Sequence, residues 1–321
     1  MARVDPLGSA DETGAASRRP QSERRDVGTM YEVVLVLYRS RELAESLLTR
    51  LGPDVPVVVV DNGRGVDGAQ TLVEGRPLLR YLSGPGEGFA KAANLGARVS
   101  EAEYVLFVNP DSSPEVAQLE QLVDRLQADP ALIAVGATTV LEDGRVELGV
   151  GGWQPSVARS VVHAFGLHKI WPTGGIYARP APGRPMDVEW ISGACMAVRR
   201  ADFLALGGFD ESFFVYNEDM AFGRRAARAG RGVLLCTDIL VPHLGAGSGE
   251  AKPRMFQMRG ASMYQYVRAA NSAPSAQAIR VVLTVATALR VVATGLRRNT
   301  GLSRAHRAYI HGLWHGAPDM S

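Results

Sequence analysis

Two adjacent carboxylates, Glu218 and Asp219, lie between an aromatic run, "FFVY", and a segment with the pattern of an amphipathic helix. Acidic groups in the first turn of a helix stabilise its positive end, and Asn217 is a residue type favoured as an N-cap. A carboxylate held at a rigid helix start and backed by apolar residues can also take a proton from a bound hydroxyl. The pair therefore suits either helix capping or general-base catalysis.

Another carboxylate, Asp111, and a histidine, His243, each follow an apolar run of strand character. Alone, Asp111 suits a turn, and His243 suits a structural role that one hydrogen bond satisfies. Together they would supply an oxygen and a nitrogen ligand to Mn²⁺ or Mg²⁺, and such an ion could bridge a diphosphate. The helix that follows Asp111 is expected to begin at Pro114, with Ser113 as its N-cap.

A further carboxylate, Asp61, ends the apolar run "VPVVVV". There it could contact a ribose hydroxyl or a base edge, or it could form a turn with its own backbone. The glycines of "GRGVDG", residues 63–68, match the spacing of a dinucleotide-binding loop. They begin after Asp61 and Asn62 instead of at the strand end, and the next helix is short. A flexible turn is therefore the better interpretation of these glycines.

The elements that must position these residues alternate between apolar runs and helical patterns. Strands that lack polar alternation and are separated by helices predict an α/β domain, with a parallel sheet covered on both faces. Ligands bind outside the carboxyl ends of such strands, so Asp61 and Asp111 should gather at one edge. Strands are expected at 32–38, 55–60, 104–108 and 132–137, and helices at 40–51, 88–100 and 114–127.

The pattern changes after residue 137. Residues 138–153 suggest a hairpin, and residues 153–187 are rich in Gly, Pro, His and aromatic residues without clear periodicity. A segment of that length and composition favours a binding element or a mobile lid. Regular structure is expected to resume at residues 188–200.

The composition limits the classes of function. With 35 basic and 33 acidic residues the net charge is only +2, which argues against a general nucleic-acid binder. Residues 1–29 are expected to be a disordered tail. Residues 251–321 are expected to be basic helices, in which Arg290 leaves the longest apolar run too short to span a bilayer. Such helices suit an anionic membrane surface, packing on the preceding domain, or a dimer contact.

Seven blocks in order, "VVLVLYRS", "VVVVDNG", "GFAKAANLGAR", "YVLFVNPDSSP", "VEWISGACMAVRR", "GGFDESFFVYNEDMAFGRRAARAG" and "VPHLGAGS", carry a specific resemblance. Together they resemble a family 2 glycosyltransferase, and most of all its bacterial rhamnosyltransferase branch. The similarity covers about residues 31–249. It implies the GT-A fold over residues 30–250, with a nucleotide-binding half to about residue 137 and an acceptor half after it. It also implies a nucleotide-diphosphate sugar donor, a divalent metal and inversion at the anomeric carbon.

The resemblance also implies roles for individual residues. Asp219 would be the catalytic base, and Glu218 would orient the acceptor or cap the helix. Two positions depart from the family pattern, because Asn109 replaces the first acid of the Asp-x-Asp element and Ala221 replaces a second Asp after Asp219. The remaining roles are nucleoside binding for Asp61 and Asn62, donor-pocket contacts for Gly88 and Asn94, metal ligation for Asp111 and His243, and the lining between donor and acceptor for Trp190, Ser192 and Gly193.

The implied activity is transfer of rhamnose from thymidine diphosphate rhamnose to a hydroxyl acceptor, with a polyprenyl-diphosphate-linked glycan as the favoured acceptor. The expected location is cytoplasmic and peripheral to the inner face of the cell membrane. Two alternatives stay open: decoration of a soluble natural product, and a non-catalytic relative that binds a nucleotide sugar. A sugar nucleotidyltransferase is disfavoured, because "YRSRELAES" after the first strand contains no glycine-rich loop.

Overall fold

The structure is a computed structural model, and it describes residues 30–181, 183–244 and 252–318. The predicted tail at residues 1–29 and the predicted domain junction at residues 250–251 lie outside these ranges. The division of the first domain into a nucleotide half and an acceptor half stays a prediction.

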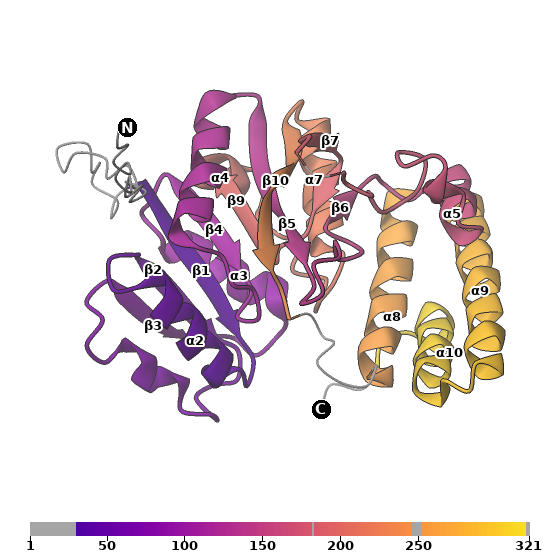
Figure 1. The fold of residues 1–321 in the computed structure, drawn as a ribbon, viewed down its shortest axis with the longest axis horizontal. Helices are drawn as coiled ribbons and strands as arrows, with labels where there is room; N and C mark the ends of the chain where they lie inside the picture. Colours follow the sequence, from indigo (N-terminus) through magenta and orange to yellow (C-terminus); the bar gives the residue numbers. More distant parts are fainter. Residues whose placement is uncertain (1–29, 182, 245–251, 319–321) are drawn as a thin grey trace, which may run out of the picture.

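The centre of the molecule is an eight-stranded sheet with the order β3-β2-β1-β4-β9-β5-β10-β7 (Figure 1). Its strands form from valine-rich runs such as "VVVVD", whose five residues are all buried. β9 runs antiparallel to both of its neighbours and β7 runs antiparallel to β10, while the other pairs are parallel. This confirms the predicted α/β class with a mostly parallel sheet. The strands are β1 (Tyr31–Leu37), β2 (Val57–Asp61), β3 (Leu79–Ser83), β4 (Tyr104–Val108), β5 (Leu132–Val140), β7 (Met186–Val188), β9 (Cys195–Arg199) and β10 (Gly232–Pro242).

Helices cover both faces of this sheet. On one face α2 (Arg41–Leu51) and α4 (Val116–Ala128) bury leucine stripes at helical spacing. On the other face lie α3 (Phe89–Val99), α6 (Arg200–Ala205) and α7 (Glu218–Arg228), with alanines and phenylalanines inward. Close packing of α3 needs a residue without a side chain, since a Cβ at Gly96 would lie 2.5 Å from Val34.

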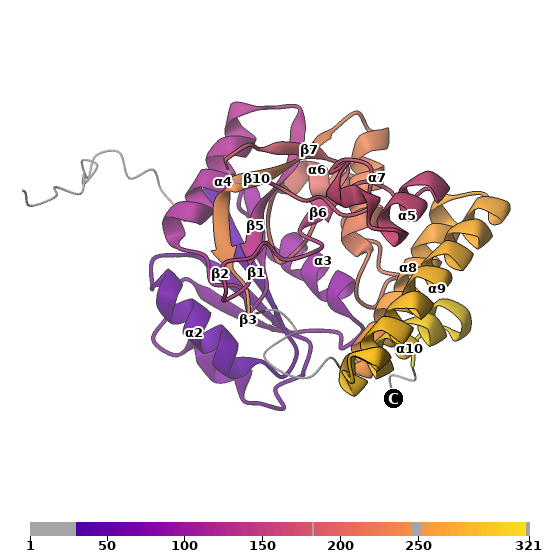
Figure 2. The ribbon, with the colours of Figure 1, turned by 45° about the vertical axis from the view of Figure 1, so that its right-hand side comes forward.

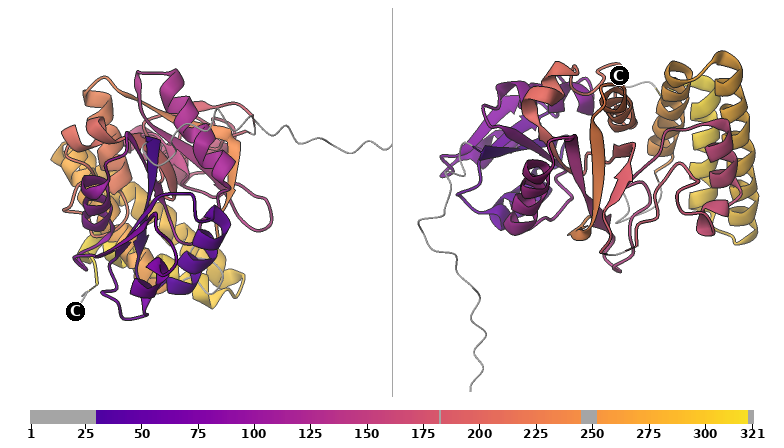
Figure 3. Two further views of the ribbon diagram at one scale, coloured as in Figure 1. Left: turned by 90° about the vertical axis from the view of Figure 1, so that its left-hand side faces the viewer. Right: turned by 90° about the horizontal axis from the view of Figure 1, so that it is seen from above.

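The C-terminal helices form a bundle at the opposite end of the molecule from β2 and β3 (Figure 1, Figure 3). They are α8 (Pro253–Ala270), α9 (Ala273–Leu296) and α10 (Thr300–His315). α8 and α10 cross closely at two glycines, because a Cβ at Gly260 would lie 2.2 Å from the Tyr309 carbonyl and one at Gly312 would lie 2.0 Å from the Gln257 carbonyl. The predicted helical extension is therefore present.

A shared hydrophobic cluster joins this bundle to α7 and to β8 (Trp190–Ile191), the partner of β6 (Gly151–Gly152). Met220 from α7 lies in the same cluster as Met263 from α8 and Ile279 from α9. Of the roles predicted for the C-terminal helices, the structure therefore shows packing on the preceding domain.

The segment at residues 153–187 is more regular than its composition suggested. It contains α5 (Val157–Ala164), the short 3₁₀ helix η3 (Leu167–Lys169) and β7. α5 packs beside α9 of the bundle (Figure 2). Another 3₁₀ helix, η2 (Ala69–Val73), follows the glycine-rich turn at residues 63–68.

One predicted helix start was wrong, and one expected helix cap lacks its side-chain hydrogen bond. α4 begins at Val116 instead of Pro114, because Glu115 and Gln118 form a reciprocal capping box while the Ser113 amide donates to the Pro242 carbonyl. Asn217 precedes α7 but makes no side-chain cap hydrogen bond, because its amide is turned toward Ser262 of α8.

Among the described residues one helix, α9, is long and apolar enough to cross a membrane by length and composition. By length and composition, α9 contradicts the prediction that Arg290 leaves this stretch too short to span a bilayer. In the structure the inner face of α9, with Ala276, Ile279 and Leu283, is buried against the rest of the molecule.

Candidate active site

A cavity of about 620 Å³ opens between the carboxyl edge of the sheet and the C-terminal bundle. Asp111 reaches it from the loop after β4, His243 from the end of β10, and Asp219 from the first turn of α7. Three distant parts of the chain thus converge as the sequence predicted. The predicted site residues that line the cavity are Asp111, Trp190, Ser192, Gly193, Glu218, Asp219 and His243.

Asp111 and His243 meet because the loop after β4 pairs with the end of β10. Ser112 and His243 form a β-bridge, and the Leu244 amide donates to the Asp111 carbonyl over 2.9 Å. The Nε2 atom of His243 lies 3.1 Å from Asp111 Oδ1. Its other ring nitrogen, Nδ1, lies 2.6 Å from Glu147 Oε2. The imidazole is therefore held between two carboxylates.

Glu147 was not among the sequence-predicted residues. It lies in the turn after β5, where its amide donates to the Thr139 carbonyl and its carboxylate accepts from the Thr139 hydroxyl over 2.9 Å. Burial lowers the pKa of His243, but hydrogen bonds to Asp111 and Glu147 outweigh burial and raise the pKa to about 9. The imidazole therefore carries a proton at neutral pH and must lose it before it can bind a metal.

The described residues contain no group of three or more His, Cys, Asp or Glu side chains arranged as metal ligands. The Asp111–His243 pair nevertheless fits a divalent cation, since it presents one oxygen and one nitrogen donor to the same cavity. Metal-ligating histidines commonly donate their second ring N–H to a carboxylate, and Glu147 stands in that position. Oxygen atoms of a diphosphate ligand would be needed to complete the coordination.

Glu218 and Asp219 open α7 after two consecutive residues with left-handed backbone, Tyr216 (φ 68°) and Asn217 (φ 67°). Such a conformation is strained for residues other than glycine. α8 supports it, because the Ser262 hydroxyl donates to the Tyr216 carbonyl and also contacts the Asn217 amide. The bundle therefore fixes the direction in which both carboxyl groups enter the cavity.

Burial raises the pKa of both carboxyl groups. For Glu218 the charge of Asp219 adds to this effect, and Glu218 Oε2 is buried without a hydrogen-bond partner. For Asp219, hydrogen bonds from the backbone oppose the rise in pKa that burial causes. One of them is donated by the Met220 amide to Asp219 Oδ1 over 2.7 Å. The pair therefore favours one neutral carboxylic acid beside one carboxylate that can accept a proton.

Asp61 and Asn62 organise loops and do not line this cavity. Asp61 is fully buried and accepts from the Gly63 amide (2.7 Å), the Gly65 amide (2.6 Å) and the Tyr81 hydroxyl (2.8 Å). The Asn62 side chain donates to the Gly88 carbonyl over 2.7 Å. Their nucleoside contacts stay a prediction, and the protein already uses these polar atoms to shape the edge of the sheet.

Gly88 occupies a position that only glycine fits. Its φ is +102°, and a Cβ there would lie 2.2 Å from the Phe214 carbonyl, which accepts from the Phe89 amide. Gly88 therefore brings the start of α3 against the loop that precedes α7. It does not line the cavity, whereas its neighbour Phe89 does.

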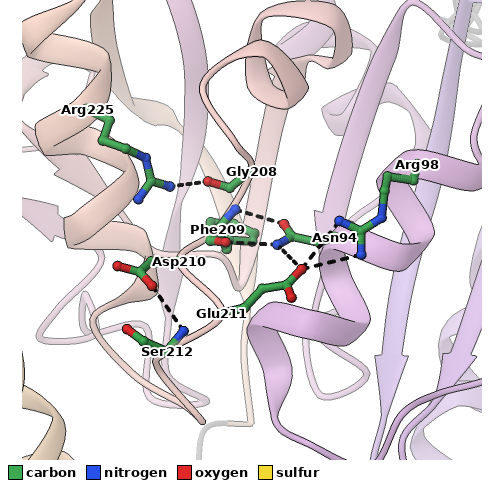
Figure 4. A network of polar contacts seen from close by, with 8 residues as sticks. All are labelled: Asn94, Arg98, Gly208, Phe209, Asp210, Glu211, Ser212 and Arg225. Atoms are coloured by element: carbon green, nitrogen blue, oxygen red, sulfur yellow. Dashed lines mark hydrogen bonds and ion pairs between the residues drawn. The ribbon is translucent and has the colours of Figure 1, made fainter.

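Asn94 is not brought to the cavity. Its side-chain amide donates to the Phe209 carbonyl (2.8 Å) and to Glu211 (3.0 Å), and its oxygen accepts from the Phe209 amide (2.8 Å) (Figure 4). Only 1% of the residue is exposed. Asn94 thus ties α3 to the loop before α7, and its contact with the donor stays a prediction.

Comparison with known proteins shows the family of this chain. Residues 38–201 match the profile of glycosyl transferase family 2. N-acetylglucosaminyl-diphospho-decaprenol L-rhamnosyltransferase of Mycobacterium tuberculosis is 32% identical over 219 residues, which are 62% of this chain and 70% of that protein. Rhamnosyltransferase WbbL of Escherichia coli K12 is 25% identical over 215 residues, 63% of this chain and 78% of that protein.

A solved structure shows the same fold. It is the mannosyltransferase PcManGT from Pyrobaculum calidifontis, in complex with GDP-Man and Mn²⁺. Its TM-score is 0.56 at 18% identity, and the match covers 88% of this chain and 87% of that one. The family profile ends at residue 201, before Asp219 and His243. With its mostly parallel sheet of GT-A type and its rhamnosyltransferase relatives, the chain belongs to glycosyl transferase family 2.

Proposed function

We propose that this glycosyltransferase moves rhamnose, with inversion, from thymidine diphosphate rhamnose to a hydroxyl of an acceptor carried on a polyprenyl diphosphate. One observation carries the proposal: a single cavity joins the Asp219 carboxylate to the Asp111–His243 pair. The relative from Mycobacterium tuberculosis supports the sugar and the acceptor, because its name states both.

In the proposed reaction Asp219 accepts the proton of the acceptor hydroxyl. The oxygen then bonds to the anomeric carbon while the bond to the diphosphate oxygen breaks on the opposite side, which inverts the centre. A nucleoside diphosphate leaves as an anion and needs no proton, so one base suffices. Mn²⁺ or Mg²⁺ held by Asp111 and His243 would stabilise the negative charge that develops on the β-phosphate.

Glu218 has a supporting role in this scheme. Because burial and the charge of Asp219 raise its pKa, Glu218 stays protonated when Asp219 is ionised. A neutral carboxylic acid in that place can donate a hydrogen bond to the acceptor and orient it. Trp190 closes the cavity beside it, with its indole N–H donating to the Trp153 carbonyl.

We also propose that the enzyme works in the cytoplasm on the inner face of the cell membrane. Its support is a stripe of exposed aliphatic residues along the outer face of α9, hereafter the α9 stripe, which consists of Val281, Val285, Leu289, Val292 and Leu296. Apolar faces of this kind partition into the boundary between headgroups and acyl chains. A polyprenyl-linked acceptor would reach the cavity from that boundary.

The test is transfer by the purified protein with thymidine diphosphate rhamnose, Mn²⁺ and a diphosphate-linked N-acetylglucosamine acceptor. Asp219→Asn should reduce kcat by a factor of about 10² to 10⁴, the range for loss of a general base. Donor binding by calorimetry should remain, because Asn keeps the shape of the side chain. Transfer by Asp219→Asn at the wild-type rate would refute the role of this residue.

A further inference from the structure

Two arginines of the C-terminal bundle, Arg259 and Arg290, line the same cavity as the Asp219 carboxylate. Each lies on the helix face that turns toward the cavity, because its lining neighbours recur at intervals of three and four residues. On α8 the face is Met255, Phe256, Arg259 and Met263, on α9 it is Leu283, Ala286, Thr287 and Arg290, and on α10 it is His306 and Tyr309.

Neither guanidinium group forms an ion pair in the described part of the chain, although Arg259 acts electrostatically on the Glu147 carboxylate. Both side chains are exposed to the cavity, and no carboxylate lies within ion-pair distance of them. Arg259 lies over the Tyr216 ring at 4.9 Å and over the Phe256 ring at 5.7 Å. These contacts orient its guanidinium while leaving the N–H groups available.

Tyr177 lines the same cavity as Arg259, Arg290 and Asp219, and all three charges act on the pKa of its phenol. Burial raises the pKa of Tyr177, and the charge of Asp219 raises it further. The charges of Arg259 and Arg290 oppose this rise. The two guanidinium groups therefore act on the same phenol as the proposed base. Burial also raises the pKa of Tyr309 on α10, and the charges of Arg290 and Arg259 both oppose that rise.

The wall that holds the two arginines is otherwise largely apolar. Met255, Phe256, Met263 and Leu283 flank the guanidinium groups. Two cations set in apolar surface fit an amphiphile whose diphosphate is attached to hydrocarbon, since a guanidinium binds phosphate oxygens in pairs. The donor diphosphate is already assigned to the metal at Asp111 and His243, so the arginines remain for a second anion.

We infer that Arg259 and Arg290 bind the diphosphate of the acceptor, and that the apolar faces of α8 and α9 hold its first isoprenoid units. The inference rests on the proposed function and assigns the acceptor half of the site. It makes the bundle the part of the enzyme that selects a lipid-linked acceptor.

The experiment compares two acceptors with the full-length protein. One is N-acetylglucosamine linked through a diphosphate to a short isoprenoid chain, and the other is the same sugar on a neutral alkyl chain. In Arg259→Gln and in Arg290→Gln the ratio of kcat/KM for the first acceptor to that for the second should fall about tenfold or more, as expected for a lost charge-assisted hydrogen bond. Arg290→Lys should recover part of the ratio.

Arg297→Gln and Arg304→Gln are matched controls. Arg297 follows the last residue of α9 and Arg304 lies on α10, both are exposed, and neither lines the cavity. They should leave the ratio at its wild-type value. An unchanged ratio in Arg259→Gln and Arg290→Gln would overturn the inference. So would a rise in donor KM at an unchanged ratio, since the arginines would then serve the donor. Transfer by the wild-type protein to neither acceptor would instead refute the proposed function.

Discussion

The Nε2 atom of His243 lies 3.1 Å from Asp111 Oδ1, although 132 positions separate the two residues along the chain. The contact exists because the loop after β4 pairs with the end of β10. Both residues therefore stand at one edge of the sheet, where the cavity also receives Asp219. This convergence would allow one pocket to hold the proposed metal-diphosphate site and the proposed base.

Glu147→Gln should weaken metal binding without removing a proposed ligand. The carboxylate holds the Nδ1 atom of His243 at 2.6 Å and fixes the ring, and loss of such a partner typically costs a factor of about 10 to 100 in affinity. Titration of Mn²⁺ in the presence of thymidine diphosphate, followed by electron paramagnetic resonance, measures this directly. Glu142→Gln, an exposed change in the same turn, is the control. Equal Mn²⁺ affinity in both variants would exclude a positioning role for Glu147.

Glu218→Gln should change how stability depends on pH. Burial and Asp219 raise the pKa of Glu218 above its ordinary value of 4.5, so the folded protein holds this proton more tightly than the unfolded chain does. The contribution of this proton to the free energy of unfolding is therefore fully present below pH 4.5. It is lost as the pH rises through the raised pKa of Glu218. The melting temperature of Glu218→Gln minus that of the wild type should therefore be a few degrees more positive at pH 8 than at pH 4.5. Melting curves that shift equally at both pH values would contradict the raised pKa.

Asn94→Ala should reduce stability more than it affects the donor. The substitution leaves the Phe209 amide and carbonyl buried without their partners, which costs about 1–3 kcal/mol for each unsatisfied group. Denaturant unfolding measures the loss. Arg98→Ala removes only an exposed ion pair with Glu211, worth about 0–1 kcal/mol, and serves as the comparison. A raised donor KM with unchanged stability would return Asn94 to the donor pocket.

Leu289→Glu together with Leu296→Glu should abolish binding to anionic vesicles if the α9 stripe lies on the membrane. These residues are 56% and 81% exposed, so the substitutions leave the hydrophobic cluster of the bundle intact. Co-sedimentation with phosphatidylglycerol vesicles measures the effect. Leu78→Glu, a change at a 41% exposed leucine between η2 and β3, is the control. Vesicle binding by the double variant at the wild-type level would exclude the stripe as the contact surface.

Sequence patterns predicted the class of the sheet and, together with the family resemblance, seven of the residues around the cavity. Valine-rich strands without polar alternation can be buried on both faces only in a covered parallel sheet, which places Asp111 at its carboxyl edge. His243 follows the last long strand for the same reason. Asp219 could be found because it starts a helix directly after an aromatic run.

Other features depend on contacts that no local pattern carries. Glu147 enters the site through a turn in which Glu142 is an equally acidic neighbour, so its type and spacing gave no signal. The family resemblance placed Asn94 in the donor pocket, but no local pattern indicates that its side chain bonds to backbone 115 residues away. The left-handed pair Tyr216 and Asn217 is held by Ser262 from a distant helix. Arg259 and Arg290 face the cavity only because the bundle folds back over α7.

The cavity is bounded by two parts of the chain that are separate in sequence, the edge of the sheet and the bundle after residue 252. The bundle side can therefore change independently of the sheet edge, provided that the support which Ser262 gives to the turn before α7 is kept. Homologues that keep the sheet edge but carry a different C-terminal bundle would use the same nucleoside diphosphate leaving group with a different acceptor. Chimaeras cut in the segment 245–251 are the natural way to reprogramme what this enzyme decorates.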